Sequence, residues 1–194
     1  MNLRKLREAR VYFDLVEISA ISRRYFVIGF FDGLITIAGM IIGAYLSGHN
    51  TRELIIPVGF ATALALGISS SWGAFEAERI EQKALRYRRE KSMLSKLDET
   101  IFDEAHKFAT FFSSLVHGVS PMLGALILIL PYVFLSPFEA LECSLIICSA
   151  SLFVLGVVMG RMAKDRAILN GLRMLILGLI VLVIVLVLNP GHVI

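Results

Sequence analysis

The sequence predicts an all-α, polytopic membrane protein with five transmembrane helices in each chain. Of its 194 residues, 57% are hydrophobic and only 18% are charged, and the mean hydropathy is +0.76. The charged residues gather in blocks, separated by nearly uncharged stretches long enough to cross a bilayer as helices. A soluble domain of this length is less apolar and spreads its charges more evenly. These observations predict one integral membrane domain.

The N-terminal arm, residues 1–24, has the pattern of an amphipathic helix, because leucines recur near helical spacing opposite arginines and lysines. Two positions for this helix stay open. It lies either in the headgroup region, attracted to anionic lipid, or against the cytoplasmic part of the protein itself. No cleavable signal peptide is expected, since the arm is charged and the first apolar run is too long.

The first two spans are expected within residues 25–75, at about 25–46 and 54–75. Helical spacing continues beyond the second span to Lys96, which predicts a cytoplasmic extension of that helix. Asp98 and Glu99 then suit the start of a short cytoplasmic helix before span three, because carboxylates favour helix N-termini. Residues 76–107 form this cytoplasmic helical segment.

The last three spans are expected within residues 108–189, at about 108–135, 139–160 and 168–188. Pro121 and Pro131 fall inside the first of these and predict kinks. Of the 19 Lys and Arg residues, all but Arg52 fall in the N-terminal arm, in the second connection or around the last connection. The positive-inside rule therefore predicts a cytoplasmic N-terminus and a C-terminus on the opposite side.

Small residues predict close contacts between helices. Gly-x-x-x-Gly pairs occur at Gly29/Gly33, Gly39/Gly43 and Gly156/Gly160, a spacing that lets helix backbones approach one another. Packing within one chain is the default interpretation. Because five spans form a thin bundle, a homodimer that builds a pathway between its subunits is the natural extension.

Asp32 is the first candidate for function, because a charged side chain inside a span costs about 2.5 kcal/mol or more. A carboxylate binds either a divalent cation or a proton, which is a basis for antiport. Thr36 lies one turn later on the same face, Gly33 leaves space beside the carboxylate, and Met40 offers a thioether. The alternative is a neutralised carboxylate with a structural role.

Other polar residues within the spans extend this predicted pathway. His117 either relays protons or binds a metal, or its ring makes an ordinary hydrogen bond between helices. The hydroxyl groups of Thr62 and Ser70 either bond their own helix or line a polar path.

Acidic residues in the cytoplasmic segment form a third candidate group. Glu78 and Glu81 are three residues apart, while Glu99, Asp103 and His106 follow i, i+4, i+7 spacing. Each set shares one helix face, and two such faces together would form a metal site. The alternative is ordinary surface ion pairs with the arginines and lysines of the same segment.

Two function classes are excluded at this stage. The sequence holds no nucleophile motif, Walker loop or dinucleotide fingerprint, so an enzyme is not expected. The positive charges flank apolar spans and mark a membrane side, so no nucleic-acid partner is expected either. No cofactor is implied.

The order of these features resembles the vacuolar iron transporter family, which includes the yeast vacuolar iron and manganese transporter and nodulin-like relatives of plants. The resemblance covers nearly the whole membrane part. It rests on Asp32-Gly33-Leu34 with Thr36 and Gly39, on the charged extension of span two, and on three later patterns. These patterns are Ser120-Pro121 with Gly124, Ala125, Pro131 and Tyr132, then Gly156 to Arg161, and Gly171 to Gly178.

The resemblance implies a homodimer with five spans per chain, which moves Fe²⁺, Mn²⁺ or another divalent metal out of the cytoplasm in exchange for protons. The family's first-helix carboxylate corresponds to Asp32. In span two, Thr62 and Ser70 stand where the family has a glutamate and a methionine. The cytoplasmic segment is also shorter than the family's metal-binding domain. Two alternatives therefore remain, a transporter of a different solute and a membrane scaffold that transports nothing.

Overall fold

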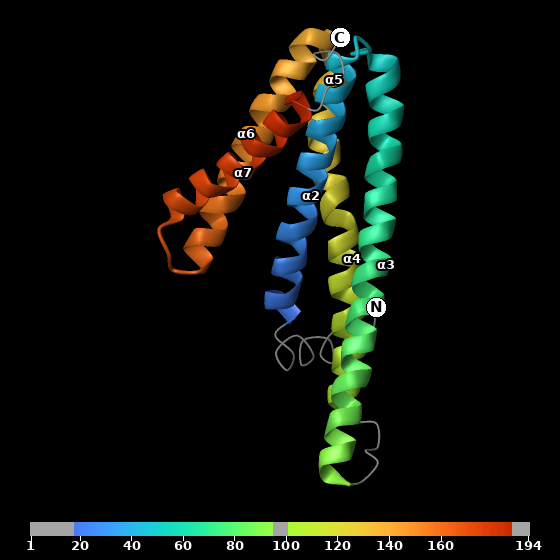
Figure 1. The fold of residues 1–194 in the computed structure, drawn as a ribbon. Helices are drawn as coiled ribbons and strands as arrows, with labels where there is room; N and C mark the ends of the chain where they lie inside the picture. The colour runs from blue at the N-terminus through green and yellow to red at the C-terminus, as the bar shows by residue number, and fades with distance from the viewer. Residues whose placement is uncertain (1–17, 95–100, 188–194) are drawn as a thin grey trace, which may run out of the picture. The chain divides into compact units, whose positions relative to one another are not determined.

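The computed structural model describes residues 18–94 and 101–187, and within these ranges all regular structure is α-helical (Figure 1). The helices are α2 (Ile18–Leu46), α3 (Arg52–Met93), α4 (Ile101–Ile129), α5 (Pro131–Phe134), α6 (Pro137–Met162) and α7 (Ala167–Val187). Five candidate spans are long and apolar enough to cross a membrane, and α4 and α5 share one of them. The predicted all-α fold with five spans is confirmed.

The structure changes two predicted boundaries. Residues 18–24, assigned above to the N-terminal arm, belong to α2, while residues 1–17 lie outside the described residues. Residues 101–107 belong to α4 rather than to a separate short helix, since no glycine or proline interrupts the chain before Gly118. Asp98 and Glu99 lie outside the described residues, so their predicted capping role stays a prediction.

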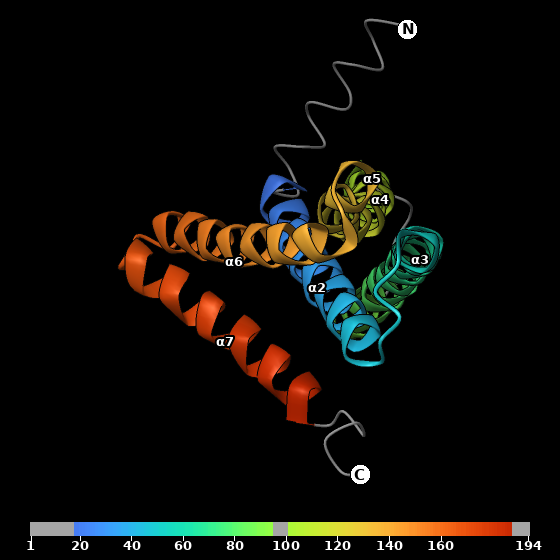
Figure 2. The same cartoon turned by 90° about the horizontal axis from the view of Figure 1, so that it is seen from above.

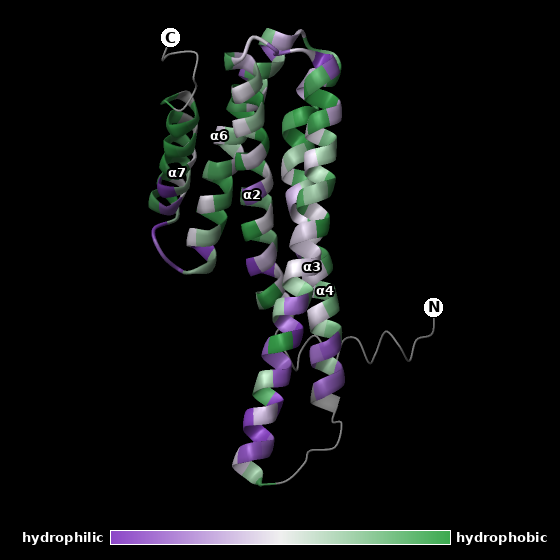
Figure 3. Ribbon diagram, turned by 45° about the vertical axis from the view of Figure 1, so that its right-hand side comes forward, coloured by the Kyte–Doolittle hydropathy of each residue, from purple (hydrophilic) through white to green (hydrophobic). Residues whose placement is uncertain are grey.

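Helix α3 combines an apolar half and a charged half without a break. It runs for 42 residues from Arg52 to Met93. Figure 3 shows hydrophobic colouring over its first half and hydrophilic colouring over its second half. The predicted continuation of span two into a charged helix is therefore present in the structure.

The prolines of span three act differently from one another. Helix α4 continues through Pro121 and ends at Ile129, and Pro131 is the first residue of the four-residue helix α5. A proline is tolerated at the start of a helix because its missing N–H would have no helical partner there. Pro131 thus marks the interruption of this span.

The chain divides into two compact units. Among the described residues, the first takes in 18–28, 67–94 and 101–120, and the second takes in 29–66 and 121–187. Helices α2, α3 and α4 supply residues to both units. The main hydrophobic core lies in the second unit, where Leu34, Ile37 and Ile41 of α2 are fully buried together with Leu128 of α4.

A backbone contact between α2 and α4 lies at one side of this core. A Cβ atom at Gly33 would overlap the carbonyl oxygen of Pro121, and one at Gly124 would lie 2.6 Å from the carbonyl oxygen of Phe30. Neither position has room for a side chain. In a bilayer, close backbone approach of this kind supplies packing energy that the hydrophobic effect does not supply between helices.

Polar groups join the connections at one end of the second unit. The hydroxyl of Tyr132, a fully buried residue, donates to Oδ1 of Asn50 at 2.9 Å. The amide of Asn50 donates to the Pro137 carbonyl at 2.9 Å, and the guanidinium of Arg52 donates to the Leu135 carbonyl at 3.1 Å. The α2–α3 turn is thereby bonded to the α5–α6 turn.

Helices α6 and α7 pack as an antiparallel pair joined by a short connection (Figures 1 and 2). A Cβ atom at Gly156 would lie 2.7 Å from Cα of Gly171, and one at Gly160 would lie 2.7 Å from Cα of Ala167. The predicted close contact at the Gly156/Gly160 pair is confirmed.

In the connection between α6 and α7, the backbone N–H of Arg166 and the side-chain amide of Asn170 donate hydrogen bonds to the Asp165 carboxylate. These bonds lower the pKa of Asp165.

The α2–α4 contact predicts opposite outcomes for the change of glycine to alanine at two positions. Gly33→Ala is expected to destabilise the protein by about 1–3 kcal/mol, since the added methyl group meets backbone atoms that cannot rotate away. Gly73→Ala on α3 is the matched control, because nothing lies within 4 Å of its Cβ position and alanine is the better helix former. Thermal unfolding of the two purified variants measures the difference. Equal stability of both variants would contradict the contact.

Candidate functional site

Asp32 lies on the surface of α2, with its side chain exposed in the single chain. Its neighbour Gly33 is buried against Pro121 of α4. Because successive helical residues point about 100° apart, this packing turns the carboxylate away from α4. The expectation that Gly33 leaves space beside the carboxylate is wrong, since backbone atoms of α4 occupy that space.

The face of α2 that carries Asp32 is composed of small and polar residues. Thr36 is half-buried one turn on. Gly39 and Gly43 continue the face. A Cβ atom at Gly39 would lie 3.9 Å from one side-chain atom, and a Cβ atom at Gly43 would have no such neighbour within 4 Å. The Gly39/Gly43 pair therefore makes no close helix contact among the described residues of one chain, in contrast to Gly156/Gly160.

Met40 packs toward the interior of the second unit. Its methyl carbon would lie 3.5 Å from a Cβ at Gly59 of α3, and its side chain packs against the hydrophobic core. This position leaves its predicted role as a thioether ligand a prediction. Thr62 of α3 is also half-buried, and its hydroxyl donates to the carbonyl of Val58 in the same helix at 2.8 Å.

Tyr25 joins three helices within the first unit. Its hydroxyl donates to Oε1 of Glu78 on α3 at 2.8 Å, and its ring centroid lies 4.9 Å from that of His117 on α4. The Tyr25 carbonyl lies 3.0 Å from Nδ1 of His117 and also accepts a longer bond, 3.5 Å, from the Ser120 hydroxyl. The guanidinium of Arg24 lies 5.5 Å from the centre of the Tyr25 ring.

This arrangement joins two predicted site residues, Glu78 and His117, through Tyr25. The sequence pattern predicts Tyr25 only as the first residue of a span. Its residue type and its position at the end of a span could have indicated this role. Tyrosines are enriched where a span meets the headgroup region, and their hydroxyls form hydrogen bonds with polar partners.

The contact with Tyr25 also determines the chemistry of His117. A carbonyl oxygen accepts hydrogen bonds only, so Nδ1 of the half-buried ring carries the proton. In the neutral ring, Nε2 then keeps a lone pair for a proton or a metal ion. The hydrogen bond between helices and the relay, given as alternatives above, are therefore compatible.

Most serine hydroxyls near His117 bond their own helix. Ser113 and Ser114 both donate to the carbonyl of Thr110, at 3.3 and 2.6 Å. A close contact between α3 and α4 follows nearby, where a Cβ at Gly118 would lie 2.8 Å from the Gly67 carbonyl and 2.7 Å from Cβ of Ser71. Ser70, a predicted pathway residue, is half-buried on α3.

The predicted cytoplasmic acids do not form one cluster in the part of the chain that the structure describes. Glu78 bonds Tyr25, Glu81 is exposed, and Asp103 and His106 line a common pocket between α3 and α4. Within residues 18–94 and 101–187, no three His, Cys, Asp or Glu side chains group closely enough to hold a metal. Glu99 lies outside these ranges, so the predicted cytoplasmic metal site stays a prediction.

Comparison with known proteins identifies the family of this chain. A sequence model of the VIT family matches residues 23–112 and 93–188, which together cover the first candidate span from residue 23 and the other four in full. The uncharacterized protein MJ0645 of Methanocaldococcus jannaschii is 33% identical over 154 residues, which cover 78% of this chain and 80% of that protein. The chain is an integral multi-pass membrane protein and belongs to the vacuolar iron transporter (VIT) family.

Proposed function

We propose that this protein moves a divalent transition metal out of the cytoplasm in exchange for protons, and that it works as a homodimer. Membership of the VIT family supports membrane metal-ion transport in general. Fe²⁺ is the proposed ion, with Mn²⁺ or another divalent metal as the alternative. The observation that carries the proposal is the exposed carboxylate of Asp32 on an apolar membrane helix.

The exposure of Asp32 favours a second copy of the chain as its partner. A carboxylate facing lipid costs about 2.5–3.5 kcal/mol, and covering it with a polar interface removes most of this cost. Gly43 lies on the same face with nothing within 4 Å of its Cβ position, while Gly39 meets one side chain, Val185 of α7, at 3.9 Å. Small residues of this kind let two helices approach closely, so two α2 helices are expected to meet along this face.

A symmetric pair of Asp32 residues accounts for coupled exchange. Two carboxylates carry together the charge that neutralises one divalent cation, and each alternatively binds one proton. Exchange of one metal ion for two protons at this pair leaves its net charge unchanged.

We propose the Glu78–Tyr25–His117 group as a second ion-binding site of the pathway. Glu78 supplies a carboxylate held by the Tyr25 hydroxyl, and His117 supplies the lone pair of Nε2. A carboxylate and an imidazole nitrogen are ligands that Fe²⁺ and Mn²⁺ accept. The positive-inside rule assigns the charged half of α3, which includes Glu78, to the cytoplasm.

Asp32→Asn tests the proposed metal site. We expect uptake of Fe²⁺ into proteoliposomes under a pH gradient to fall at least about tenfold, because the amide neither neutralises the metal nor carries the exchanged proton. Glu142→Gln is the matched control, since it removes an exposed carboxylate near the other end of a span, on α6. Parallel assays with Mn²⁺ and Co²⁺ identify the preferred ion. Wild-type flux in Asp32→Asn for every metal would overturn the proposal.

The proposed dimer predicts a cross-link between copies. In a background with Cys143→Ser and Cys148→Ser, Gly43→Cys is expected to form a disulfide-linked dimer under mild oxidation, seen on a non-reducing gel. Leu126→Cys, at an exposed position of α4, is expected to stay monomeric under the same conditions. Equal cross-linking at both positions would show random collision instead of this interface.

The Tyr25 contact predicts a measurable coupling to Glu78. Tyr25→Phe is expected to destabilise the protein by about 1–2 kcal/mol, since it removes a hydrogen bond to a charged group. In a double-mutant cycle, most of this loss should disappear when Glu78→Gln is already present. Tyr45→Phe changes an exposed tyrosine of the same helix and should have little effect. A coupling energy near zero would refute the contact.

A further inference from the structure

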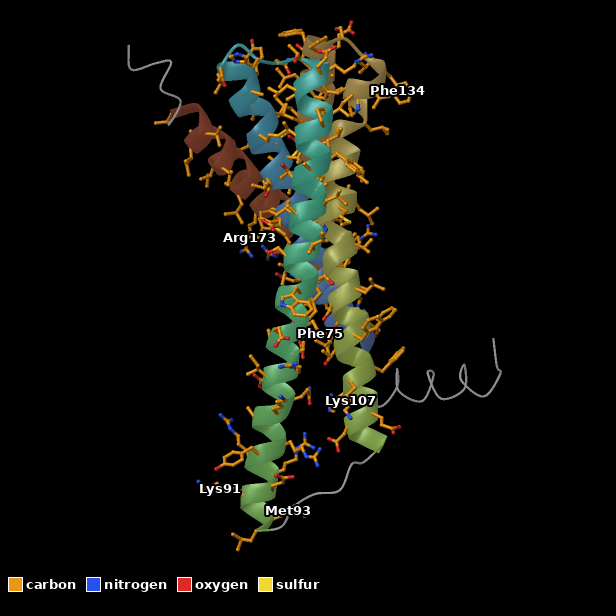
Figure 4. All side chains as sticks on the ribbon, turned by 90° about the vertical axis from the view of Figure 1, so that its right-hand side faces the viewer. Phe75, Lys91, Met93, Lys107, Phe134 and Arg173 are labelled. Atoms are coloured by element: carbon orange, nitrogen blue, oxygen red, sulfur yellow. The ribbon has the colours of Figure 1, made fainter. Side chains whose placement is uncertain are left out.

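The charged halves of α3 and α4 enclose a pocket of about 420 Å³ within the first unit. Its basic lining consists of Arg79, Lys83 and Arg86 from α3 and Lys107 from α4. Among the lining residues that the structure describes, Asp103 is the one carboxylate. Figure 4 shows Phe75 and Lys107 on the two helices, with Lys91 farther along α3.

The spacing of the basic residues explains how one pocket gathers four of them. Arg79, Lys83 and Arg86 follow i, i+4, i+7 spacing and therefore share one face of α3. Lys107 faces them from the other helix. Among the described lining residues, four cationic groups stand against one carboxylate, and this excess of positive charge attracts an anion.

Two glutamates of α3 offset part of this charge, because each pairs with an arginine of the pocket. Glu76 lies 3.4 Å from the guanidinium of Arg79, and Glu90 lies 3.2 Å from that of Arg86. Neither carboxylate lines the pocket. The side chains of these two ion pairs are partly exposed, and such pairs contribute about 0–1 kcal/mol to stability. An anion that binds more strongly can therefore replace the glutamates as partner of the two arginines.

The position of the pocket along α3 indicates headgroup depth. Phe75 lines it and is the last apolar residue before Glu76, where the charged half of the helix begins. One turn earlier, Trp72 is 66% exposed, with its ring centroid 6.0 Å from that of Phe75. Exposed tryptophans gather where a membrane meets water. Figure 3 shows the same change from hydrophobic to hydrophilic residues along α3.

We propose that this pocket binds a phosphate group. Arginine and lysine are the side chains that proteins use for phosphate, and basic pockets between helices on the cytoplasmic side take phospholipid headgroups. The two sources of that chemistry are an anionic lipid headgroup and soluble phosphate. A bound phosphate would bridge α3 to α4 and neutralise the basic groups around Asp103 and His106. The proposal does not depend on the transported ion.

The test compares two paired variants of the full-length protein in non-ionic detergent. Arg79→Gln with Lys83→Gln removes two charges from the pocket, and Arg88→Gln with Lys91→Gln removes two exposed charges of α3 that do not line it. Native mass spectrometry measures retention of phosphatidylglycerol against phosphatidylcholine. A thermal-shift titration with inorganic phosphate tests the soluble source.

We expect the pocket variant to lose at least about tenfold in affinity for one of these probes, and the control variant to lose less than about twofold. Loss in the lipid arm identifies a headgroup site, and loss in the phosphate arm alone identifies a soluble ligand. Equal losses in both variants, or no binding of either probe by the wild type, would overturn the proposal.

A variant that gains affinity for the probe distinguishes a change in the pocket from a loss of the fold. Asp103→Asn removes the carboxylate found among the described lining residues and should tighten binding of the same probe by about two- to fivefold. Damage to the fold cannot produce such a gain. Unchanged or weaker binding in Asp103→Asn would count against the pocket.

Discussion

The contact of α2 with α4 at Gly33, Pro121 and Gly124 is the constraint on which the second unit depends. Lipid tails are as apolar as leucine, so helices in a bilayer gain little from burying leucine and associate mainly where backbones meet closely. The same contact leaves Gly33 no room for a side chain and directs Asp32 outward. One requirement of packing thus holds the helices together and presents the carboxylate.

The two candidate ion-binding sites, at Asp32 and at the Glu78–Tyr25–His117 group, are built differently. Asp32 is presented by an open face of small residues, whereas Glu78 and His117 are fixed by direct bonds to Tyr25. An open face needs a partner to become a binding site, while a bonded group is already arranged within one chain. The open face at Asp32 suits a binding site that forms when two chains associate. The bonded group at Tyr25 suits a site whose side chains are already oriented before a ligand binds.

Hydropathy and charge in the sequence were enough to predict five helical spans and the charged continuation of α3, because both depend on composition along the chain. The direction of individual side chains was harder to predict. Helical spacing placed Asp32, Thr36 and Met40 near one another, yet the structure packs Met40 toward Gly59 and exposes Asp32. Such differences arise from contacts between distant segments, which a local pattern does not contain.

The same limit applies to the charged segments. Spacing alone grouped Asp103 and His106 with other acids, but the facing helix brings arginines and lysines to the same pocket. Trp72 is the only tryptophan of the chain, and its ring contacts Phe75 at the edge of this pocket. The intrinsic indole fluorescence of the whole protein therefore comes from one place, where the apolar half of α3 gives way to its charged half. The molecule carries its own optical probe of polarity at that boundary, without any added label.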